Sequence, residues 1–581
     1  MFPAKLNSRM AAWVWAAILS FTFSHHASAA PDPFLMANGV HLRNDHGNGD
    51  IVPLRGVNLG SWLLMEGWQS PMDSSGLPDH YSVLQTLDHR FGLATEQNLT
   101  RTYQTTWIQA SDLDNIKAMG MNQIRLPVWW ANFQTLNGNG RADAFDRLDW
   151  VVTNAWQRGI YTIIDLHGVP GGQSTDQSTG RINQNEYWNS ASDQSQTLLI
   201  WTNLASHFKN NPAVAGYDLI NEPQGTPGSA ALWSAYVGIY RAIRAIDPNH
   251  IIFMEGTYGS WNWSMLPDPA IYGWTNVVYE MHEYQWGSTS SASGVKAGID
   301  NQVTDFQNHQ SWNVPAYIGE FNAFGTGTDT WRYAARQFNA HDMSWSIWAY
   351  KATHGSVPDS WGLYDPVGTW PATPDIASDS SNAIANAWSA WSTSAAFAIN
   401  PMLQAALGGP LAVDDHYIIC HGTTLAVDHT AGVLANDSDI NLGQSGVQLA
   451  ALLMNGPANG QLSFNADGSF AYTPKPFFAG TDAFRYRVSD GYASSVNLAT
   501  VTIQVGPATN PPPVFCTASH GLVQLSWPPD HTGWQVQAQT NSVKAGLGTN
   551  WVTIAGSSPT NQFTFPISAA NGSVFFRLIY P

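Results

Sequence analysis

Eight short runs of β-branched and apolar residues alternate with longer segments of helical periodicity between about residues 50 and 350. This alternation is typical of β/α units around a parallel sheet. Since eight parallel strands close a β/α barrel, the sequence predicts an α/β fold with a (β/α)8 TIM barrel. The expected strands cover residues 54–58, 123–126, 161–165, 216–220, 251–254, 277–281, 316–319 and 344–348, and amphipathic helices are expected at 112–120 and 231–246.

The character of the chain changes after about residue 400, where short alternating strands between Gly, Asn and Asp turns replace the helical periodicity. Residues 460–464 and 469–472 flank a turn at 465–468 and predict a hairpin. A proline-rich segment at 507–513 is typical of a stiff linker. We therefore expect two small all-β sandwich domains after the barrel. The predicted parts are a signal peptide (1–29), the barrel domain (31–400), a β-sandwich (411–506), the linker (507–513) and a C-terminal β domain (514–581).

The first residues have the pattern of a secretory signal peptide. Lys5 and Arg9 precede an apolar run at 11–23, and Ala27-Ser28-Ala29 resembles a cleavage site for a signal peptidase. The run is shorter than the roughly 20 residues that span a bilayer, and no later segment is apolar enough to do so. We expect a protein without a membrane span that is secreted, either extracellular or periplasmic once the signal peptide is removed.

The charge and the aromatic content narrow the range of partners. A formal net charge of -18 offers no basis for binding a phosphate backbone, so nucleic acid is an unexpected partner. The 27 Trp, 20 Tyr and 24 Phe suit stacking against sugar rings as well as core packing. Cys420 and Cys516 fall in different predicted domains, so neither a disulfide framework nor a cysteine metal site is indicated.

Polar residues recur where the predicted strands end, which is where β/α barrels carry their reacting groups. Cleaving a glycosidic bond needs one carboxylic acid to protonate the leaving oxygen and a second carboxylate to attack or to activate water. Glu222 after the fourth strand and Glu320 after the seventh supply such a pair, with Glu255, Glu280 and Glu283 as rival carboxylates. The other residues at strand ends are Arg125, His167, Asn221, His282, Tyr284 and Trp348.

These positions, with Asn221-Glu222-Pro223 after the fourth strand, resemble the retaining barrels of glycoside hydrolase family 5. The resemblance makes Glu222 the acid/base and Glu320 the nucleophile of a double displacement. It implies that Arg125 and Tyr284 are hydrogen-bonded near that nucleophile and keep it ionised. No metal or organic cofactor is implied.

The same resemblance assigns the remaining strand-end residues to the sugar. Asn221 would bind the 2-hydroxyl, and His167 and His282 would position sugar hydroxyls and the acid/base. Trp348 would be the platform beneath the sugar in the subsite before the scissile bond.

Two further motifs resemble the exo-β-1,3-glucanase branch of the family: residues 55–62, continuing to Glu66, and residues 165–173. In that branch Glu66 would contact a hydroxyl of the terminal glucose, whereas a glutamate at a helix start is the structural alternative. The loop after Gln173 departs from the fungal enzymes of this branch, so exo and endo action both stay open. Four tryptophans near strand ends are either further sugar platforms or core residues, namely Trp129, Trp130, Trp286 and Trp361.

The C-terminal region resembles cadherin-like or immunoglobulin-like repeats, followed by a fibronectin type III-like module. Such modules are spacers or make contact with a cell surface or a glycan. Trp534 and Trp551 would bind glycan or fill the core. Four aspartates would either bind calcium or cap turns, namely Asp414, Asp415, Asp437 and Asp439.

The leading hypothesis is a secreted β-glucanase acting on β-1,3- or β-1,4-linked glucosides in a polysaccharide or oligosaccharide. A β-mannanase or another β-glycosidase is the alternative within the enzymes, because the same carboxylates serve many sugars. A non-catalytic polysaccharide-binding protein is the alternative from another class. Transglycosylation stays open because no sequence feature separates it from hydrolysis.

Overall fold

The computed structural model describes residues 33–256, 263–353, 361–443, 446–541, 547–566 and 573–580. The predicted signal peptide lies outside these ranges. Within them, we find no helix that combines the length and the apolar character needed to cross a membrane.

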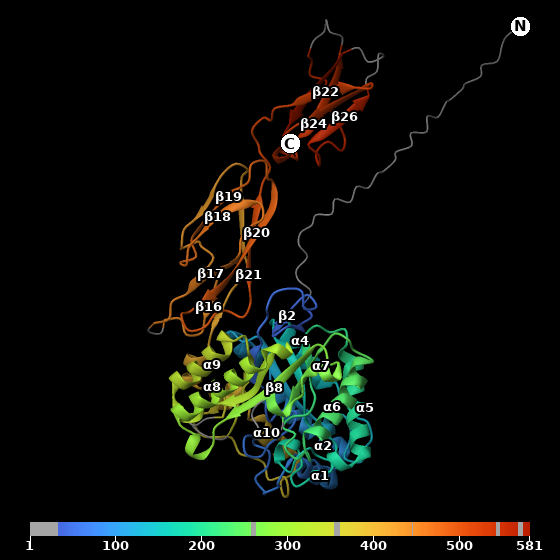
Figure 1. Cartoon of the computed structure of the whole chain (residues 1–581), viewed down its shortest axis with the longest axis vertical. Helices are drawn as coiled ribbons and strands as arrows, with labels where there is room; N and C mark the ends of the chain where they lie inside the picture. Colours follow the sequence, from blue (N-terminus) through green and yellow to red (C-terminus); the bar gives the residue numbers. More distant parts are fainter. Residues whose placement is uncertain are drawn as a thin grey trace, which may run out of the picture. The chain divides into compact units, whose positions relative to one another are not determined.

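The described residues contain a closed barrel of eight parallel strands, in the order β10-β3-β4-β5-β6-β7-β8-β9. Helices lie on both sides of strand β8 of this barrel in Figure 1. Pairing of Ile347 with Val57 joins the last strand to the first and closes it. Each strand overlaps one of the eight predicted runs, which confirms the predicted fold class. The strands are β3 (Arg55–Asn58), β4 (Gln123–Trp129), β5 (Tyr161–Gly168), β6 (Val214–Asp218), β7 (Ile251–Glu255), β8 (Val277–Tyr284), β9 (Ala316–Asn322) and β10 (Ser344–Ile347).

Helices between the strands cover the barrel from outside. In α6 the buried residues Leu232, Tyr236, Ile239 and Ile243 recur at helical spacing, so one apolar face packs on the barrel. The described helices are α1 (His80–Phe91), α2 (Leu93–Trp107), α3 (Ala110–Ala118), α4 (Asp146–Trp156), α5 (Ala191–Phe208), α6 (Ser229–Arg244), α7 (Pro269–Tyr272), α8 (Ala292–Asn308), α9 (Thr328–Ala340), α10 (Ser381–Ser389), α11 (Thr393–Ala396) and α12 (Pro401–Leu407).

The barrel interior changes from apolar to charged along the strands. At the amino-terminal end Leu42, from the hairpin of β1 (Met36–Asn38) and β2 (His41–Arg43), packs in one buried cluster with Phe253 and Val278. Because side chains on one face of a strand recur every second residue, Val278 is followed on β8 by Glu280 and His282. The carboxyl ends of the strands therefore form a polar, buried mouth.

Two β modules follow the barrel. In the first, Phe464 pairs with Phe470 across the predicted hairpin, which confirms that hairpin. One sheet has the order β14-β21-β20-β17 and another β15-β19-β18. The bounds are β11 (Tyr364–Pro366) and β12 (Phe397–Ile399) beside the barrel, then β13 (Pro410–Leu411), β14 (Asp415–Ile419), β15 (Leu425–Val427), β16 (Ser438–Asp439), β17 (Ala450–Asn455), β18 (Gly460–Phe464), β19 (Phe470–Pro474), β20 (Gly480–Ser489) and β21 (Ala499–Val505).

The last module holds two three-stranded sheets, β22-β23-β26 and β25-β24-β27. Trp534 is buried and donates to the carbonyl of Ala508, as a core tryptophan does, whereas Trp551 is partly exposed with Arg577 over its ring. Cys420 and Cys516 are both exposed and free, in agreement with the expectation of no disulfide. The strands are β22 (Phe515–Ser519), β23 (Leu522–Ser526), β24 (Gln535–Asn541), β25 (Val552–Thr553), β26 (Gln562–Pro566) and β27 (Ser573–Ile579).

Three of the four candidate calcium ligands cap backbone amides. Asp414 accepts from Thr500 N–H at 2.7 Å, Asp437 accepts from Val413 N–H at 2.7 Å, and Asp439 accepts from Asn441 N–H at 2.6 Å.

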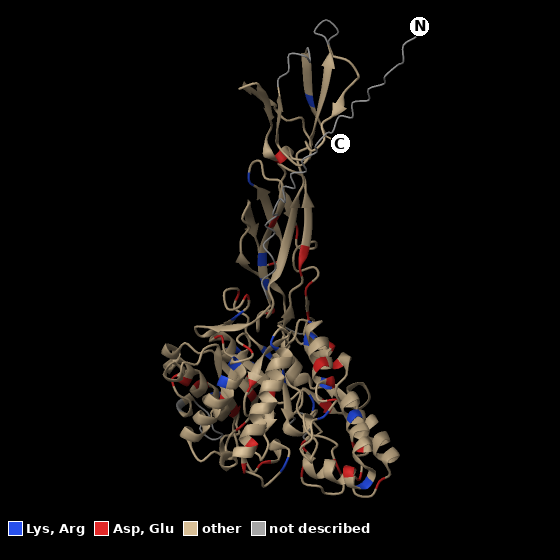
Figure 2. Cartoon of the chain, turned by 90° about the vertical axis from the view of Figure 1, so that its right-hand side faces the viewer, with Lys and Arg blue, Asp and Glu red and all other residues tan. Residues whose placement is uncertain are grey.

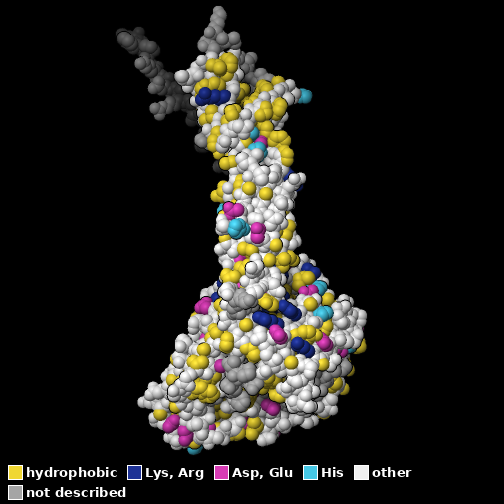
Figure 3. Space-filling model, turned by 90° about the vertical axis from the view of Figure 1, so that its left-hand side faces the viewer, with side chains coloured by type: hydrophobic (Ala, Val, Ile, Leu, Met, Phe, Trp, Pro, Cys, Tyr) yellow, Lys and Arg dark blue, Asp and Glu magenta, His cyan; other side chains and the backbone are white. Residues whose placement is uncertain are grey.

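Figure 2 shows acidic and basic residues interspersed over the barrel helices and few on the β modules. On the face drawn in Figure 3, hydrophobic side chains are most frequent on the last module.

Candidate active site

The predicted nucleophile Glu320 lies on β9 with a donor on each carboxylate oxygen. Arg125 Nη1 donates to Oε1 at 2.8 Å, and the hydroxyl of Tyr284 donates to Oε2 at 2.8 Å. Both bonds stabilise a negative charge on the carboxylate, and the charged donor contributes most. The arrangement suits a carboxylate that attacks.

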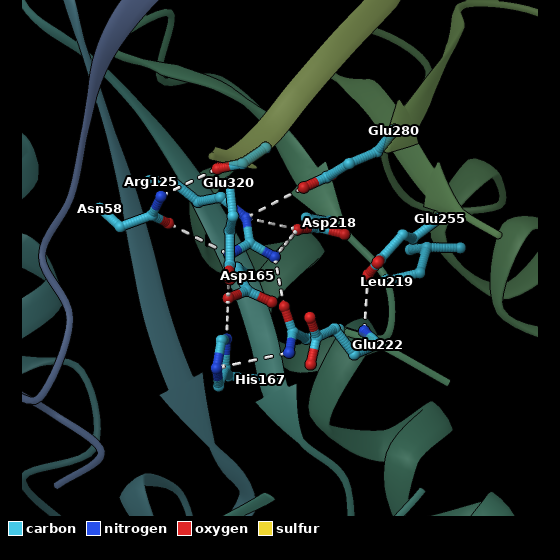
Figure 4. A network of polar contacts seen from close by, with 12 residues as sticks. Asn58, Arg125, Asp165, His167, Asp218, Leu219, Glu222, Glu255, Glu280 and Glu320 are labelled. Carbon is cyan, nitrogen blue, oxygen red and sulfur yellow. Dashed lines mark hydrogen bonds and ion pairs between the residues drawn. The ribbon is translucent and has the colours of Figure 1, made fainter. Parts of the chain in front are cut away.

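Arg125 is the centre of a buried charge network (Figure 4). Its side chain is 0% exposed and also donates to two amide oxygens, Asn58 Oδ1 at 3.1 Å and Asn221 Oδ1 at 2.7 Å. Burial alone would lower the pKa of Arg125, but the surrounding carboxylates outweigh it and raise that pKa well above its usual value. These carboxylates are Asp165 at 3.2 Å, Asp218 at 2.7 Å, Glu280 at 3.2 Å and Glu320 at 2.8 Å.

Three of these carboxylates hold protons more tightly than usual. Burial raises the pKa of Asp165 to about 7 and that of Asp218 to about 6, and it raises the pKa of Glu280 well above its ordinary range. Asp218 was not among our sequence candidates. A usable signal was present, because Asp218 is a charged residue at the end of β6, a strand without any other charged residue.

The predicted acid/base Glu222 follows β6. Its Oε1 lies 3.0 Å from Nδ1 of His282. Burial raises the pKa of Glu222 to about 7, so this group holds its proton in mildly acidic solution. Ligand atoms of Glu222, His282 and Glu320 lie within 4.8 Å of one another, close enough to bind a cation as well as to act on one bond. One oxygen of each carboxyl group therefore lies within 4.8 Å of the other group, close enough for both groups to act on one glycosidic bond.

The two histidines are neutral at ordinary pH and act as fixed donors and acceptors. Burial lowers the pKa of His167 to about 4 and that of His282 to about 3. Nδ1 of His167 lies 2.6 Å from Asp165, which sets the orientation of the ring. Trp348 is nearly buried and stacks on His167 with a centroid distance of 5.3 Å.

Asn221 is held from two sides at the mouth. Its Oδ1 accepts from Arg125, and its Nδ2 lies 3.4 Å from Nε2 of His167. Gln173, which belongs to the second glucanase-like motif, donates through Nε2 to the carbonyls of His167 and Asn221, both at 2.8 Å. The amide thereby joins the ends of the third and fourth barrel strands.

Glu66 is buried next to the carboxylate pair and does not start a helix, because α1 begins at His80. The side chains of Trp68 and Gln69 each donate to it at 2.8 Å. Burial, together with the charges of Glu320 and Glu222, raises the pKa of Glu66 to about 8. A protonated Glu66 can donate a hydrogen bond to a sugar oxygen.

The four candidate platform tryptophans separate into two groups. Trp129 is fully buried and stacks on His80 at 4.8 Å, and Trp130 packs on Tyr81. Both rings pack against neighbouring side chains, and these contacts do not support a role for either tryptophan as a sugar platform.

Trp286 and Trp361 lie at the rim of the mouth. Trp286 is 49% exposed, and its ring centroid is 5.7 Å from Tyr284, the residue that donates to Glu320. Trp361 lies 5.8 Å from Trp286 and 4.7 Å from Trp68. These rings form a continuous aromatic rim beside the nucleophile, suited to a sugar face.

The rival carboxylates have other partners. Glu280 contacts Arg125, and Glu283 accepts from Gln302 on α8, outside the barrel. Glu255 accepts from the backbone N–H of Glu222. Glu283 has a donor on each carboxylate oxygen, as Glu320 has, but both donors are neutral amides, Gln285 at 2.9 Å and Gln302 at 3.0 Å.

The raised pKa of Glu222 predicts how activity depends on pH. Catalysis needs the protonated acid, so kcat/KM should fall as the pH rises through about 7. The negative charge of Asp176 contributes to the raised pKa of Glu222. Asp176→Asn removes this charge, so we expect the falling limb of kcat/KM to shift to lower pH, by less than one unit because water screens an exposed charge.

The pH profiles of the two enzymes, measured with one soluble substrate, test this expectation. Asn can still cap Ser178 N–H as Asp176 does, which preserves the loop. Asp329→Asn, at a side chain that is 93% exposed on α9, is the matched control and should leave the profile unchanged. A limb that moves to higher pH in Asp176→Asn would contradict the assignment of Glu222 as the acid.

Two family models match the barrel and the first β module, and the relatives named below cover about half of the chain. Residues 90–354 match the family model described as cellulase (glycosyl hydrolase family 5), and residues 408–507 match the bacterial cadherin-like domain. A beta-xylosidase of Phanerodontia chrysosporium is 28% identical over 352 residues, which cover 55% of this chain and 71% of that protein. A probable glucan 1,3-beta-glucosidase A of Aspergillus niger is 28% identical over 322 residues, 53% and 73% of the two chains. The crystal structure of rutinosidase from Aspergillus niger aligns with a TM-score of 0.45 at 18% identity, over 53% of this chain and 92% of that one.

Proposed function

We propose that this glycosidase, whose barrel matches the family model of glycosyl hydrolase family 5, hydrolyses β-1,3- or β-1,4-linked glucosides of β-glucan with retention of configuration. The observation that carries the proposal is a pair of carboxyl groups, Glu222 and Glu320, that have oxygens within 4.8 Å of each other and differ in their surroundings. Glu320 has two donors, whereas burial raises the pKa of Glu222 to about 7. Such a difference is what an attacking base and a proton-donating acid require.

The reaction proceeds in two displacements. Glu320 attacks the anomeric carbon while Glu222 gives its proton to the leaving oxygen, which forms a glycosyl ester on Glu320. The ester carries no charge, so the pKa of Glu222 falls and this group can take a proton from the incoming water. The water then attacks the anomeric carbon, releases Glu320 and gives the β-configured product.

The choice of glucose rests on the relatives and on the two glucanase-like motifs. A relative named as a probable glucan 1,3-beta-glucosidase supports a β-glucan, and a relative named as a beta-xylosidase keeps another β-glycosidase as the second candidate. A β-mannanase uses the same carboxylates. The aromatic rim around Trp286 supports a substrate that extends beyond one sugar.

We also propose that the protein is exported, on the basis of the signal-peptide pattern at 1–29. The cadherin-like domain at 408–507 and the module after it then act outside the cytoplasm as spacers or as contacts to a surface or glycan.

The test is sugar release from laminarin, mixed-linkage glucan, carboxymethylcellulose, xylan and mannan by the purified chain, followed by proton NMR of the fresh product. Release from a β-glucan with the β-anomer appearing first is the expected result. An α-anomer appearing first would contradict double displacement. Release from xylan or mannan alone would replace glucan by the second candidate, and no release from any of them would favour a polysaccharide-binding protein.

A further inference from the structure

The backbone of Glu222 adopts an unusual conformation. Its φ is +37°, in the left-handed region that side chains with a Cβ rarely occupy. The next residue is Pro223, which disfavours helical conformations in the residue before it and has no N–H of its own. Something in the surroundings must therefore hold this backbone in place.

The side chain of Glu255 provides that restraint. Its Oε2 accepts the backbone N–H of Glu222 at 2.6 Å, as Figure 4 shows. Its Oε1 lies 3.6 Å from Nδ1 of His282, the atom that is 3.0 Å from Glu222 Oε1. The Glu255 carboxyl thus contacts both the backbone of Glu222 and the histidine beside the side chain of Glu222.

Glu255 is itself fixed. It ends strand β7, its residue is 4% exposed, and the hydroxyl of Tyr236 on α6 donates to its carbonyl at 2.8 Å. Burial, with the neighbouring charge of Glu222, raises the pKa of Glu255 well above its usual value. A protonated carboxyl keeps an oxygen that accepts the N–H of Glu222, so the restraint needs an acceptor and no negative charge.

We propose that Glu255 is a positioning residue for the acid/base: its carboxyl oxygen holds the left-handed backbone of Glu222 and thereby aims the Glu222 carboxyl at the leaving oxygen. Glu255 acts through Glu222 and does not touch the substrate. This inference rests on the proposed function, because it presumes that Glu222 transfers the proton. Proton transfer needs heavy atoms within hydrogen-bond reach, so a small shift of the Glu222 backbone weakens it.

The test compares two leaving groups in Glu255 variants of the full chain. A 2,4-dinitrophenyl β-glucoside leaves without a proton, whereas a β-glucosyl disaccharide needs one. In Glu255→Leu, kcat/KM should fall by roughly 100-fold for the disaccharide, within the range that general acid catalysis contributes, and should stay near the wild-type value for the dinitrophenyl glucoside. Added azide, a nucleophile that needs no base, should raise kcat of this variant on the dinitrophenyl substrate.

Two further variants keep the test decisive. Glu255→Gln retains an acceptor oxygen at the same reach and should behave as wild type on both substrates. Glu255→Asp is shorter by one methylene but still polar, so it serves as the second variant in case Glu255→Leu does not fold. It should show the same dependence of kcat/KM on the leaving group as Glu255→Leu. An equal loss on both substrates in Leu and Asp variants, or a loss in Gln as large as in Asp, would overturn the proposal. A wild-type protein that cleaves neither glucoside would instead count against the proposed function.

Discussion

Replacing Glu320 by Gln is expected to reduce hydrolysis by roughly 10⁴- to 10⁶-fold, as loss of a catalytic nucleophile does in other enzymes. The amide cannot form the glycosyl ester, and it lacks the negative charge that the donors on either side are arranged to meet. Arg125 at 2.8 Å and Tyr284 at 2.8 Å would then face a neutral group. The loss should appear in kcat, because the missing step is the attack itself.

Reducing-sugar release measures this loss, and covalent trapping identifies the residue. A 2-deoxy-2-fluoro-β-glucoside with a dinitrophenyl leaving group should label the wild-type protein at the peptide that contains Glu320 and should not label Glu320→Gln. Glu283→Gln is the matched control, since Glu283 is also buried but is bonded to Gln302 on α8, outside the barrel, and should retain most of its activity. A label on Glu255 or Glu280 would show that another carboxylate is the nucleophile.

Arg125→Met is expected to lower the free energy of unfolding by about 3–5 kcal/mol, the range found when one partner of a buried ion pair is removed. Methionine fills much of the same volume, so packing is largely kept. The loss arises because each carboxylate that is ionised beside Arg125 would either remain buried without its cation or have to take up a proton. We expect the same variant to lose activity, since Glu320 loses its charged donor.

Chemical unfolding of both proteins at one pH measures this difference. Arg158→Met is the matched control: Arg158 contacts Asp114 at 2.6 Å, but that carboxylate is 62% exposed. An exposed ion pair contributes about 0–1 kcal/mol, so this variant should unfold close to wild type. Equal stability of Arg125→Met and wild type would show that the carboxylates around Arg125 are protonated together and need no cation.

The sequence alone determined the barrel and the strand ends. The runs are bounded by loops, and β-branched or apolar residues occupy most positions of strands such as β4, β5 and β9, as strands buried on both faces require. A closed barrel brings the ends of such strands to one mouth, so Glu222 and Glu320 were expected to face each other although they are far apart in the chain. Local pattern and topology were sufficient for these predictions.

Only the tertiary structure decided which polar groups touch and how strongly each is buried. Asp218 on β6 and Glu280 on β8 contact Arg125 on β4 because all three side chains point into the barrel interior at the same level. Trp129 and Trp286 have similar places near strand ends, yet one is fully buried and the other is 49% exposed. The raised pKa of Glu222 and the bond from its N–H to Glu255 likewise depend on neighbours remote in sequence. Periodicity determines which face of a strand a residue occupies, whereas desolvation and distance depend on what the rest of the fold places opposite it.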